Sequence, residues 1–271
     1  MTRPVWLALF KLYSATEYPR PYCLEKPLDL YAALELERLI LRWEKTRICW
    51  TLNKIKTISI QRRLCLSPEA IPNSAHLVEG GRWLLVATHS GSILCYDIGA
   101  STIEPTEVIP TPFDEGTVFD DDEEAEVLLS VDMDPEAEYL TFNLGVITRR
   151  IPEGDPDPDS FYPPRYFRWI EVWHVTSDID KDGEVKGLKA ERLSRFPEQH
   201  QNTCHGFRLR GGQLAYLLDT DYEFGFLNDG PCIIVVDWKL CDPISLVYDR
   251  KVIWRIMATV SPHFIYRVVD L

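Results

Sequence analysis

Residues 76–98 constrain the fold of this chain more than any other part of its sequence. Gly80 and Gly81 predict a tight turn, because glycine adopts the positive φ angles that short hairpin loops require. Residues 83–87 form an apolar run of strand length, which indicates a strand buried on both faces. Gly91 marks a second turn, and residues 92–98 form a further strand that ends in an aromatic residue and an aspartate. This order of turns and strands resembles the middle of one WD-repeat blade.

Weaker copies of the pattern recur along the chain. A turn and then a strand are expected at residues 134–142, and the strand that follows it at 170–175. A second Gly-Gly turn with an apolar run is expected at 209–218, a strand ending in aspartate and tryptophan at 232–238, and the start of another unit at 261–270. The spacing of about 70 residues per unit exceeds the ~40–45 of a regular WD repeat, and long polar insertions account for the excess. The sequence therefore predicts a mainly β fold, a WD-like β-propeller that is partial or irregular.

The N-terminal part is different and predicts helices. Residues 2–18 have apolar side chains at helical spacing, and residues 32–46 carry one apolar stripe, formed by Leu36, Leu39, Ile40 and Trp43. A strand is expected within residues 55–66, leading into the first sheet. Two regions follow from this division: a helical segment at 1–54 and a propeller region at 55–271.

The charge of −13 is unevenly distributed. Residues 83–148 contain fifteen Asp and Glu and no Lys or Arg, whereas residues 1–66 contain twelve Lys and Arg and six Asp and Glu. The overall acidity argues against nucleic acid or an anionic membrane as partner.

No apolar run is long enough for a membrane span or a signal sequence, so we expect a cytoplasmic or nuclear protein. Seven cysteines without paired spacing indicate reduced thiols.

Two insertions interrupt the expected strands. Residues 102–126 are a proline-broken acidic loop that contains Asp120, Asp121 and Asp122. These carboxylates fit a basic partner or a cation, and they also fit a solvated loop. Residues 149–164 form the second insertion, and aromatic residues lie in it or directly after it. They indicate either a recognition surface or core packing, and they are Tyr162, Tyr166, Phe167 and Trp169.

One short segment resembles the start of a calcium loop. Asp178, Asp180 and Asp182 alternate and are followed by Gly183, but the twelfth position is Lys189 where a bidentate glutamate is expected. A hairpin turn and a weak calcium site both fit this segment. No zinc motif, phosphate loop or catalytic constellation is present in the sequence, so we expect neither a metal or other cofactor nor catalysis.

The order of motifs resembles fungal, mushroom-type F-box proteins with a WD-like propeller. The motifs are VWLAL at 5–9, PRP at 19–21, LERLILRW at 36–43, GGRWLLV at 80–86 and SGS at 90–92. The resemblance implies substrate recognition in a ubiquitin ligase. The F-box itself, expected before Val5, has no counterpart, so no adaptor-binding residue is carried over, and adaptor binding is expected only if an F-box is supplied upstream. The propeller is expected to stop inside a fourth unit.

The sequence thus predicts a non-catalytic protein-interaction domain. Propellers bind partners through loops at one end, so the insertions at 99–127 and 151–168 are the expected contact regions. Two alternatives remain open at this point: a propeller-type hydrolase with acidic residues in its channel, and a truncated product without activity.

Overall fold

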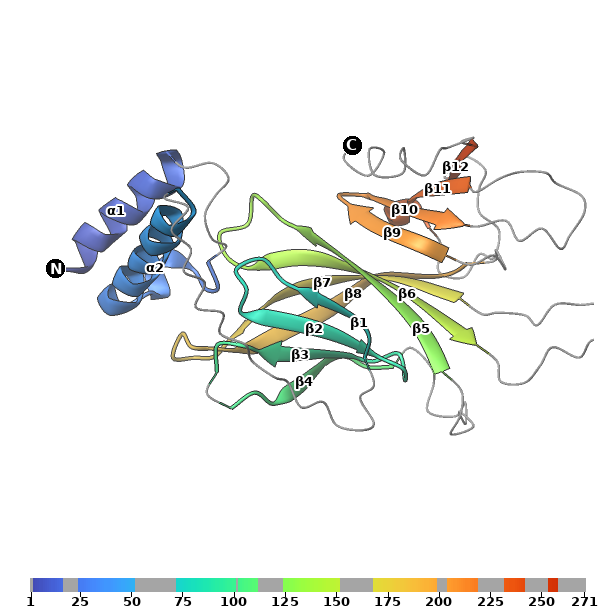
Figure 1. The fold of residues 1–271 in the computed structure, drawn as a ribbon, viewed down its shortest axis with the longest axis horizontal. Coiled ribbons are helices and arrows are strands. Elements are labelled where there is room, and N and C mark those ends of the chain that lie inside the picture. Colours follow the sequence, from blue (N-terminus) through green and yellow to red (C-terminus); the bar gives the residue numbers. More distant parts are fainter. Residues whose placement is uncertain are drawn as a thin grey trace, which may run out of the picture. The chain divides into compact units, whose positions relative to one another are not determined.

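The computed structural model describes residues 2–16, 24–51, 72–100, 102–111, 124–151, 168–198, 204–218, 232–241 and 253–257. In these residues the protein is mainly β, with three antiparallel four-stranded sheets and two α-helices (Figure 1). The chain divides into two compact units. The helical unit comprises Met1–Leu66, Pro135–Leu140 and Ser177–Gly187, and the sheet unit comprises the rest.

The helical unit contains α1 (Arg3–Thr16), η1 (Leu28–Leu30) and α2 (Ala33–Thr51), which confirms both expected helices. Its core is formed by Trp6, Leu24, Tyr31, Leu36 and Ile40. Glu35 fixes the start of α2, because its Oε2 accepts a hydrogen bond from the N–H of Ala32 at 2.7 Å, as in a capping box. Lys26 is buried beside it and pairs with Oε1 of Glu35 at 2.9 Å. Among the residues described, neither helix has the length and apolar character needed to cross a membrane.

The first sheet contains both strands predicted within residues 76–98, which are its second and third strands. It runs in the order β1 (Pro72–Leu77), β2 (Trp83–Thr88), β3 (Ile93–Asp97) and β4 (Pro105–Ile109). Both expected turns are confirmed, since Gly80, Gly81 and Gly91 have φ angles of 95°, 71° and 86°. The prediction that residues 102–126 are wholly loop is wrong. Pro105 begins an edge strand, where a proline without an N–H donor is tolerated.

The second sheet has the order β5 (Glu124–Met133), β6 (Thr141–Ile151), β7 (Arg168–Ile179) and β8 (Val185–Glu198). β7 confirms the strand expected at 170–175. β6 overlaps the strand expected by 142 only at its first two residues and continues to Ile151. β5 and β8 were not predicted, and β6 extends three residues, 149–151, into the expected second insertion. Both unpredicted strands carry many charged residues, because an antiparallel strand needs apolar side chains on its buried face alone.

The third sheet contains β9 (Cys204–Arg210), β10 (Gln213–Leu218), β11 (Cys232–Asp237) and β12 (Ile253–Met257), with η2 (Trp238–Leu240) after β11. The Gly-Gly turn and both predicted strands are confirmed, except that Trp238 belongs to η2. The strand expected within residues 55–66 and the unit expected at 261–270 lie outside the described residues.

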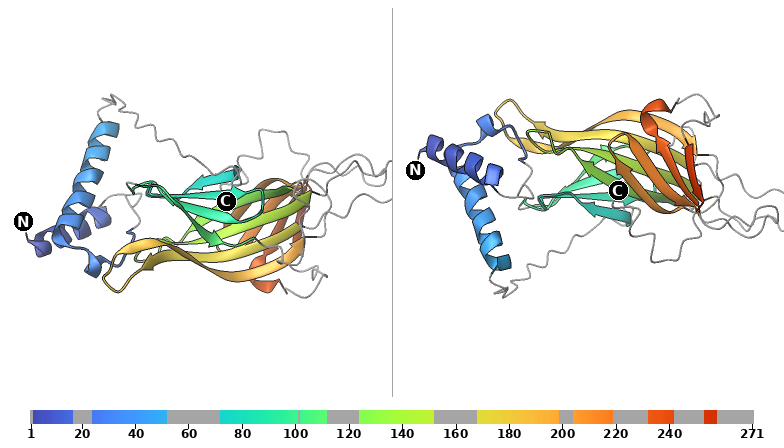
Figure 2. Two further views of the ribbon diagram at one scale, coloured as in Figure 1. Left: turned by 90° about the horizontal axis from the view of Figure 1, so that it is seen from below. Right: turned by 90° about the horizontal axis from the view of Figure 1, so that it is seen from above.

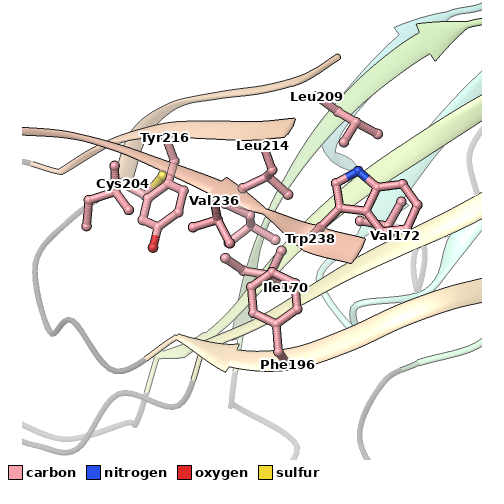
Figure 3. Close-up of a cluster of buried hydrophobic side chains, with 11 residues drawn as sticks. Ile170, Val172, Phe196, Cys204, Leu209, Leu214, Tyr216, Val236 and Trp238 are labelled. Atoms are coloured by element: carbon pink, nitrogen blue, oxygen red, sulfur yellow. The ribbon is translucent and has the colours of Figure 1, made fainter. Parts of the chain in front are cut away.

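The second and third sheets share one apolar core (Figure 3). Ile170 and Phe196 from the second sheet pack with residues of the third, among them Leu214, Val236 and Trp238. Gly145 allows this packing to be close, because a Cβ atom there would lie 2.6 Å from Cζ of Phe207. Cys95 and Cys204 are buried free thiols, as the sequence indicated, and burial raises the pKa of Cys95 to about 12.

The first strands of neighbouring sheets lie side by side, β1 beside β5 and β5 beside β9 (Figure 2). Asn73 of β1 donates to the carbonyl oxygen of Ala125 at 2.7 Å and accepts from the N–H of Val127 at 3.0 Å, both in β5. Ser130 of β5 accepts from the N–H of Leu209 in β9 at 2.8 Å. In the described residues, the three sheets do not close into a ring.

Candidate functional site

Both predicted insertions are attached to the same end of the second sheet. The segment 112–123 lies between β4 and β5, and the segment 152–167 lies between β6 and β7. The register pairs Glu124 with Ile151 and Arg149 with Arg168, so the first residue of β5, the last of β6 and the first of β7 are neighbours. We call this end, with the corresponding strand ends of the other two sheets, the insertion end.

The third sheet carries a further long segment at its corresponding end. Leu218, at the end of β10, pairs with Cys204 at the start of β9 and with Cys232 at the start of β11, and residues 219–231 join β10 to β11. Asp132 accepts a hydrogen bond from the N–H of Gly211 at 2.6 Å, two residues beyond the Ser130–Leu209 bond. β5 and β9 therefore run side by side in one direction, and their first residues lie at the same end.

The first sheet anchors both sides of the segment 112–123. The turn after β2 is held by a cluster of three hydroxyl groups, in which Oγ1 of Thr88 lies 2.8 Å from Oγ of Ser90 and 2.9 Å from Oγ of Ser92. Thr111 donates to the carbonyl oxygen of Ser90 at 2.7 Å. The N–H of Ala125 donates to the carbonyl oxygen of His89 at 2.9 Å. The chain therefore leaves and re-enters the described structure at one short turn.

A cluster of aromatic and charged side chains lies beside the start of β7. Trp169, Glu171 and Trp173 alternate along one face of β7, and Arg192 and Arg195 come from the neighbouring β8. The guanidinium group of Arg195 lies 4.3 Å from the ring centre of Trp169, and that of Arg192 lies 5.7 Å from Trp173. These distances fit cation–π contacts. We call these five residues the Trp–Arg cluster.

Glu171 is the centre of the Trp–Arg cluster and is only 2% exposed. Its Oε1 lies 3.5 Å from Arg192 and 3.5 Å from Arg195, and its Oε2 accepts a hydrogen bond from the indole N–H of Trp173 at 3.4 Å. Burial raises the pKa of Glu171, and the two arginines and the indole lower it without cancelling that effect. Both oxygens contact protein groups, so the arrangement supports the start of β7.

The predicted binding residues are only partly within the described structure. Trp169 is half-buried, and Arg195 lies against its ring. The Trp169 side chain therefore packs within the Trp–Arg cluster. The other predicted contact residues, Asp120, Asp121, Asp122, Tyr162, Tyr166 and Phe167, lie outside the described residues, although the two segments that contain them both join at the insertion end.

The candidate calcium segment forms the hairpin turn between β7 and β8. Oδ1 of Asp180 accepts hydrogen bonds from the N–H groups of Asp182 and Glu184, both at 2.9 Å. Oδ2 of Asp180 pairs with Lys186 at 3.1 Å, and Gly183 supplies a φ of 79°. The predicted hairpin turn is confirmed, and Asp180 directs both oxygens to groups of the turn itself. In the described part of the chain, no cluster of three or more His, Cys, Asp or Glu is arranged to hold a metal ion.

Sequence reasoning missed the Trp–Arg cluster apart from Trp169. Its three members on β7 lie about twenty residues before the two arginines on β8, and only pairing of β7 with β8 brings the two groups together. The alternation of Trp169, Glu171 and Trp173 was the available signal, since residues two apart share a strand face.

No family model matches this sequence, and no curated protein matches it.

Proposed function

We propose that the three sheets are consecutive blades of a WD-like β-propeller and that the chain is a non-catalytic protein-binding module. Three features of the sheet unit support the propeller. Each sheet follows the chain order strand by strand, the first strand of each sheet lies beside that of the next, and the second and third sheets share an apolar core. Blades of a propeller are joined in this manner, with the first strands innermost.

The attachment of the long segments carries the binding proposal. The segments 112–123, 152–167 and 219–231 all join at the insertion end, whereas at the opposite end the turns after β1 and β9 are short and one long segment, 242–252, joins η2 to β12. Loops gathered at one end of a rigid scaffold are a common form of protein-binding site. The partner would contact this end.

The composition of these segments indicates what kind of partner they fit. They carry six, three and four net negative charges, which together equal the net charge of −13 of the whole chain, and each also contains aromatic residues. Acidic segments steer a basic partner electrostatically, and aromatic side chains supply apolar contact area. We therefore expect a protein partner with a basic surface. The F-box resemblance extends this proposal to a ubiquitination substrate, recognised by a ligase receptor.

Affinity capture of the chain from its own cells, with quantitative mass spectrometry, tests the proposal. The triple variant D120N/D121N/D122N should lose partners, and deletion of both segments 112–123 and 152–167 should lose more. The variant E79Q/E104Q/E107Q is the matched control, since it removes the same charge from exposed residues of the first sheet. Retention of every partner after the double deletion would contradict the binding site. Recovery of a ligase adaptor and a cullin would support the ligase role.

A further inference from the structure

The Trp–Arg cluster holds a buried carboxylate that its own arginines do not fully satisfy. Glu171 is 2% exposed, and a carboxylate removed from water normally has charge-assisted hydrogen bonds of about 2.7–2.9 Å. Its contacts are longer, because Oε1 lies 3.5 Å from Arg192 and 3.5 Å from Arg195, and Oε2 lies 3.4 Å from the indole nitrogen of Trp173. Glu171 therefore keeps the capacity to accept a closer donor.

Two other carboxylates of the chain show the geometry of a close pair. Asp97 lies 2.7 Å from Arg82, and Glu35 lies 2.9 Å from the buried Lys26. Burial alone would raise the pKa of Asp97 and of Glu35, but their close partners outweigh it and the pKa of each is lowered. The pKa of Glu171 is raised by burial despite its two arginines. The cations around Glu171 thus offset its burial incompletely.

The composition of the Trp–Arg cluster is that of a cation site. Trp169 and Trp173 flank Glu171 on one face of β7, and each indole ring has a guanidinium group against it, at 4.3 Å for Arg195 and 5.7 Å for Arg192. Indole rings attract cations through their quadrupole, and the carboxylate adds a full negative charge. A hard metal ion fits less well, because it needs several oxygen ligands and the cluster offers one carboxyl group.

Arg192 is the more easily displaced of the two arginines. Its side chain is 47% exposed, whereas that of Arg195 is 26% exposed. Its distance of 5.7 Å from the ring of Trp173 is close to the limit of about 6 Å for a cation–π contact. Movement of Arg192 into solvent would uncover the ring of Trp173 and Oε1 of Glu171 together.

We propose that the Trp173 side of the Trp–Arg cluster binds an alkylammonium group, such as a lysine side chain of another protein, in place of Arg192. An ammonium group is a compact charge with three rotatable donors, so it reaches Oε1 of Glu171 more closely than the planar guanidinium group of Arg192 does. Trp169 and Arg195 keep their contacts. The cation site rests on the geometry of the cluster, and the assignment of the lysine to the basic partner rests on the proposed function.

Titration of the full-length chain with n-butylammonium chloride at constant ionic strength tests the site. Butylammonium has the end group of a lysine side chain, and tetramethylammonium, which has no N–H donor, is the comparison. Tryptophan fluorescence follows the binding, and the response should be lost in Trp173→Phe. The wild type should bind butylammonium at least tenfold more tightly than tetramethylammonium, because butylammonium alone donates to Glu171.

Three further variants assign the roles of the charged residues. Arg192→Ala should strengthen the binding of butylammonium at least tenfold, because it removes the competing guanidinium group. Glu171→Gln should weaken the binding at least tenfold, since it removes the charge and keeps the shape of the side chain. Lys189→Ala is the matched control, because it removes an exposed cation from the same strand and should bind like the wild type. Circular dichroism checks that each variant is folded.

Equal binding of butylammonium to the wild type and Glu171→Gln would overturn the proposal, as would equal binding of the two cations to the wild type. Binding by Arg192→Ala without any by the wild type would also overturn it, because Arg192 would then be a permanent occupant of the site. The titration uses no partner protein, so its failure would leave the proposed function standing. A failed affinity capture would, in turn, leave the cation site standing.

Discussion

The two ends of the sheet unit differ in the interactions that fix their strand ends and turns. At the insertion end, long segments join strands whose positions are fixed by the Trp–Arg cluster and by the turn after β2. At the short-turn end, Gly80 and Gly81 precede β2, and Gly211 and Gly212 precede β10. The short turns are determined by local backbone geometry. The insertion end depends in addition on the side chains of the Trp–Arg cluster, which meet only after β7 and β8 have paired.

The pKa values of two carboxyl groups, one at each end, are shifted in opposite directions although both groups have arginine partners. Asp97, near the first short turn, is held by Arg82 with distances of 3.1 and 2.7 Å, and its pKa is lowered. Glu171 has two arginines nearby, yet its pKa is raised because its side chain is almost fully removed from solvent. In these two carboxyl groups, the depth of burial decides whether the pKa is raised or lowered, and the number of cationic partners does not.

The largest effect is expected for Trp238→Ala at the short-turn end. Trp238 is buried in the core shared by the second and third sheets, and its indole N–H donates to the carbonyl oxygen of Gly211 at 3.0 Å. Removing a buried tryptophan should lower the free energy of unfolding by about 3–5 kcal/mol. Chemical denaturation measures this change. Lys239→Ala, next to Trp238 and exposed, is the control, and an equal loss in both variants would contradict the role of the indole.

The two Gly-Gly turns should differ although their sequences match. Gly80 and Gly81 both have positive φ angles, whereas in the pair Gly211 and Gly212 only Gly211 does, at 58°. Alanine at Gly80, Gly81 or Gly211 should each cost about 1–2 kcal/mol, because L-residues are strained in this conformation.

Gly212→Ala provides the matched comparison within the second turn. A Cβ atom there would make ordinary contact with Lys239 at 3.6 Å, so the free energy of unfolding should change by no more than about 0.5 kcal/mol. Equal losses for Gly211→Ala and Gly212→Ala would show that backbone conformation is not what distinguishes the turns. Denaturation of all four alanine variants decides this point.

Asp97→Asn should have a smaller, pH-dependent effect. Burial alone would raise the pKa of Asp97, but the hydrogen bonds and charge of Arg82, together with the N–H of Gly99, outweigh it. The depressed pKa means that the carboxylate stabilises the fold above about pH 4 and loses this contribution as the pH falls through the folded-state value. We expect a loss of about 0.5–1 kcal/mol at neutral pH, because the pair is partly exposed to solvent.

The measurement for Asp97→Asn is unfolding by denaturant across a pH series. The difference from the wild type should shrink as the pH falls below about 4. Asp237→Asn is the control, since asparagine keeps an acceptor oxygen for the N–H of Lys239, which lies 3.1 Å from Oδ1 of Asp237. A difference for Asp97→Asn that stays constant down to low pH would contradict the role of the charge.

Glu171→Gln should produce the smallest net change in the free energy of unfolding. Its pH dependence should be opposite to that of Asp97→Asn. A raised folded-state pKa means that the contribution of Glu171 to stability is fully present below the unfolded-state pKa and is lost as the pH rises through the folded-state value. Glutamine does not titrate, so the variant should gain stability relative to the wild type as the pH rises above about 4. The same pH series measures it. A variant that loses stability relative to the wild type over that range would show that pairing with Arg192 and Arg195 outweighs burial.

Local sequence signals located much of the sheet unit. The glycine turns at 80–81, 91 and 211–212 were predicted because positive φ is a property of the residue itself, and apolar runs predicted β2 and β10. β5 and β8 were missed because their charged residues conceal the apolar face. The boundaries of both insertions shifted for the same reason.

By itself, the sequence determined the helices, the short turns and the segregation of acidic charge, since each depends on residues close together in the chain. Tertiary structure alone decided which strand ends meet at the insertion end, because strand register brings Glu124, Ile151 and Arg168 together from distant parts of the chain. It also decided that Glu171 is buried between two indoles and two guanidinium groups, and that Leu34, Leu41 and Ile48 stay exposed on α2. Burial depends on what packs against a residue, which spacing along the chain does not specify.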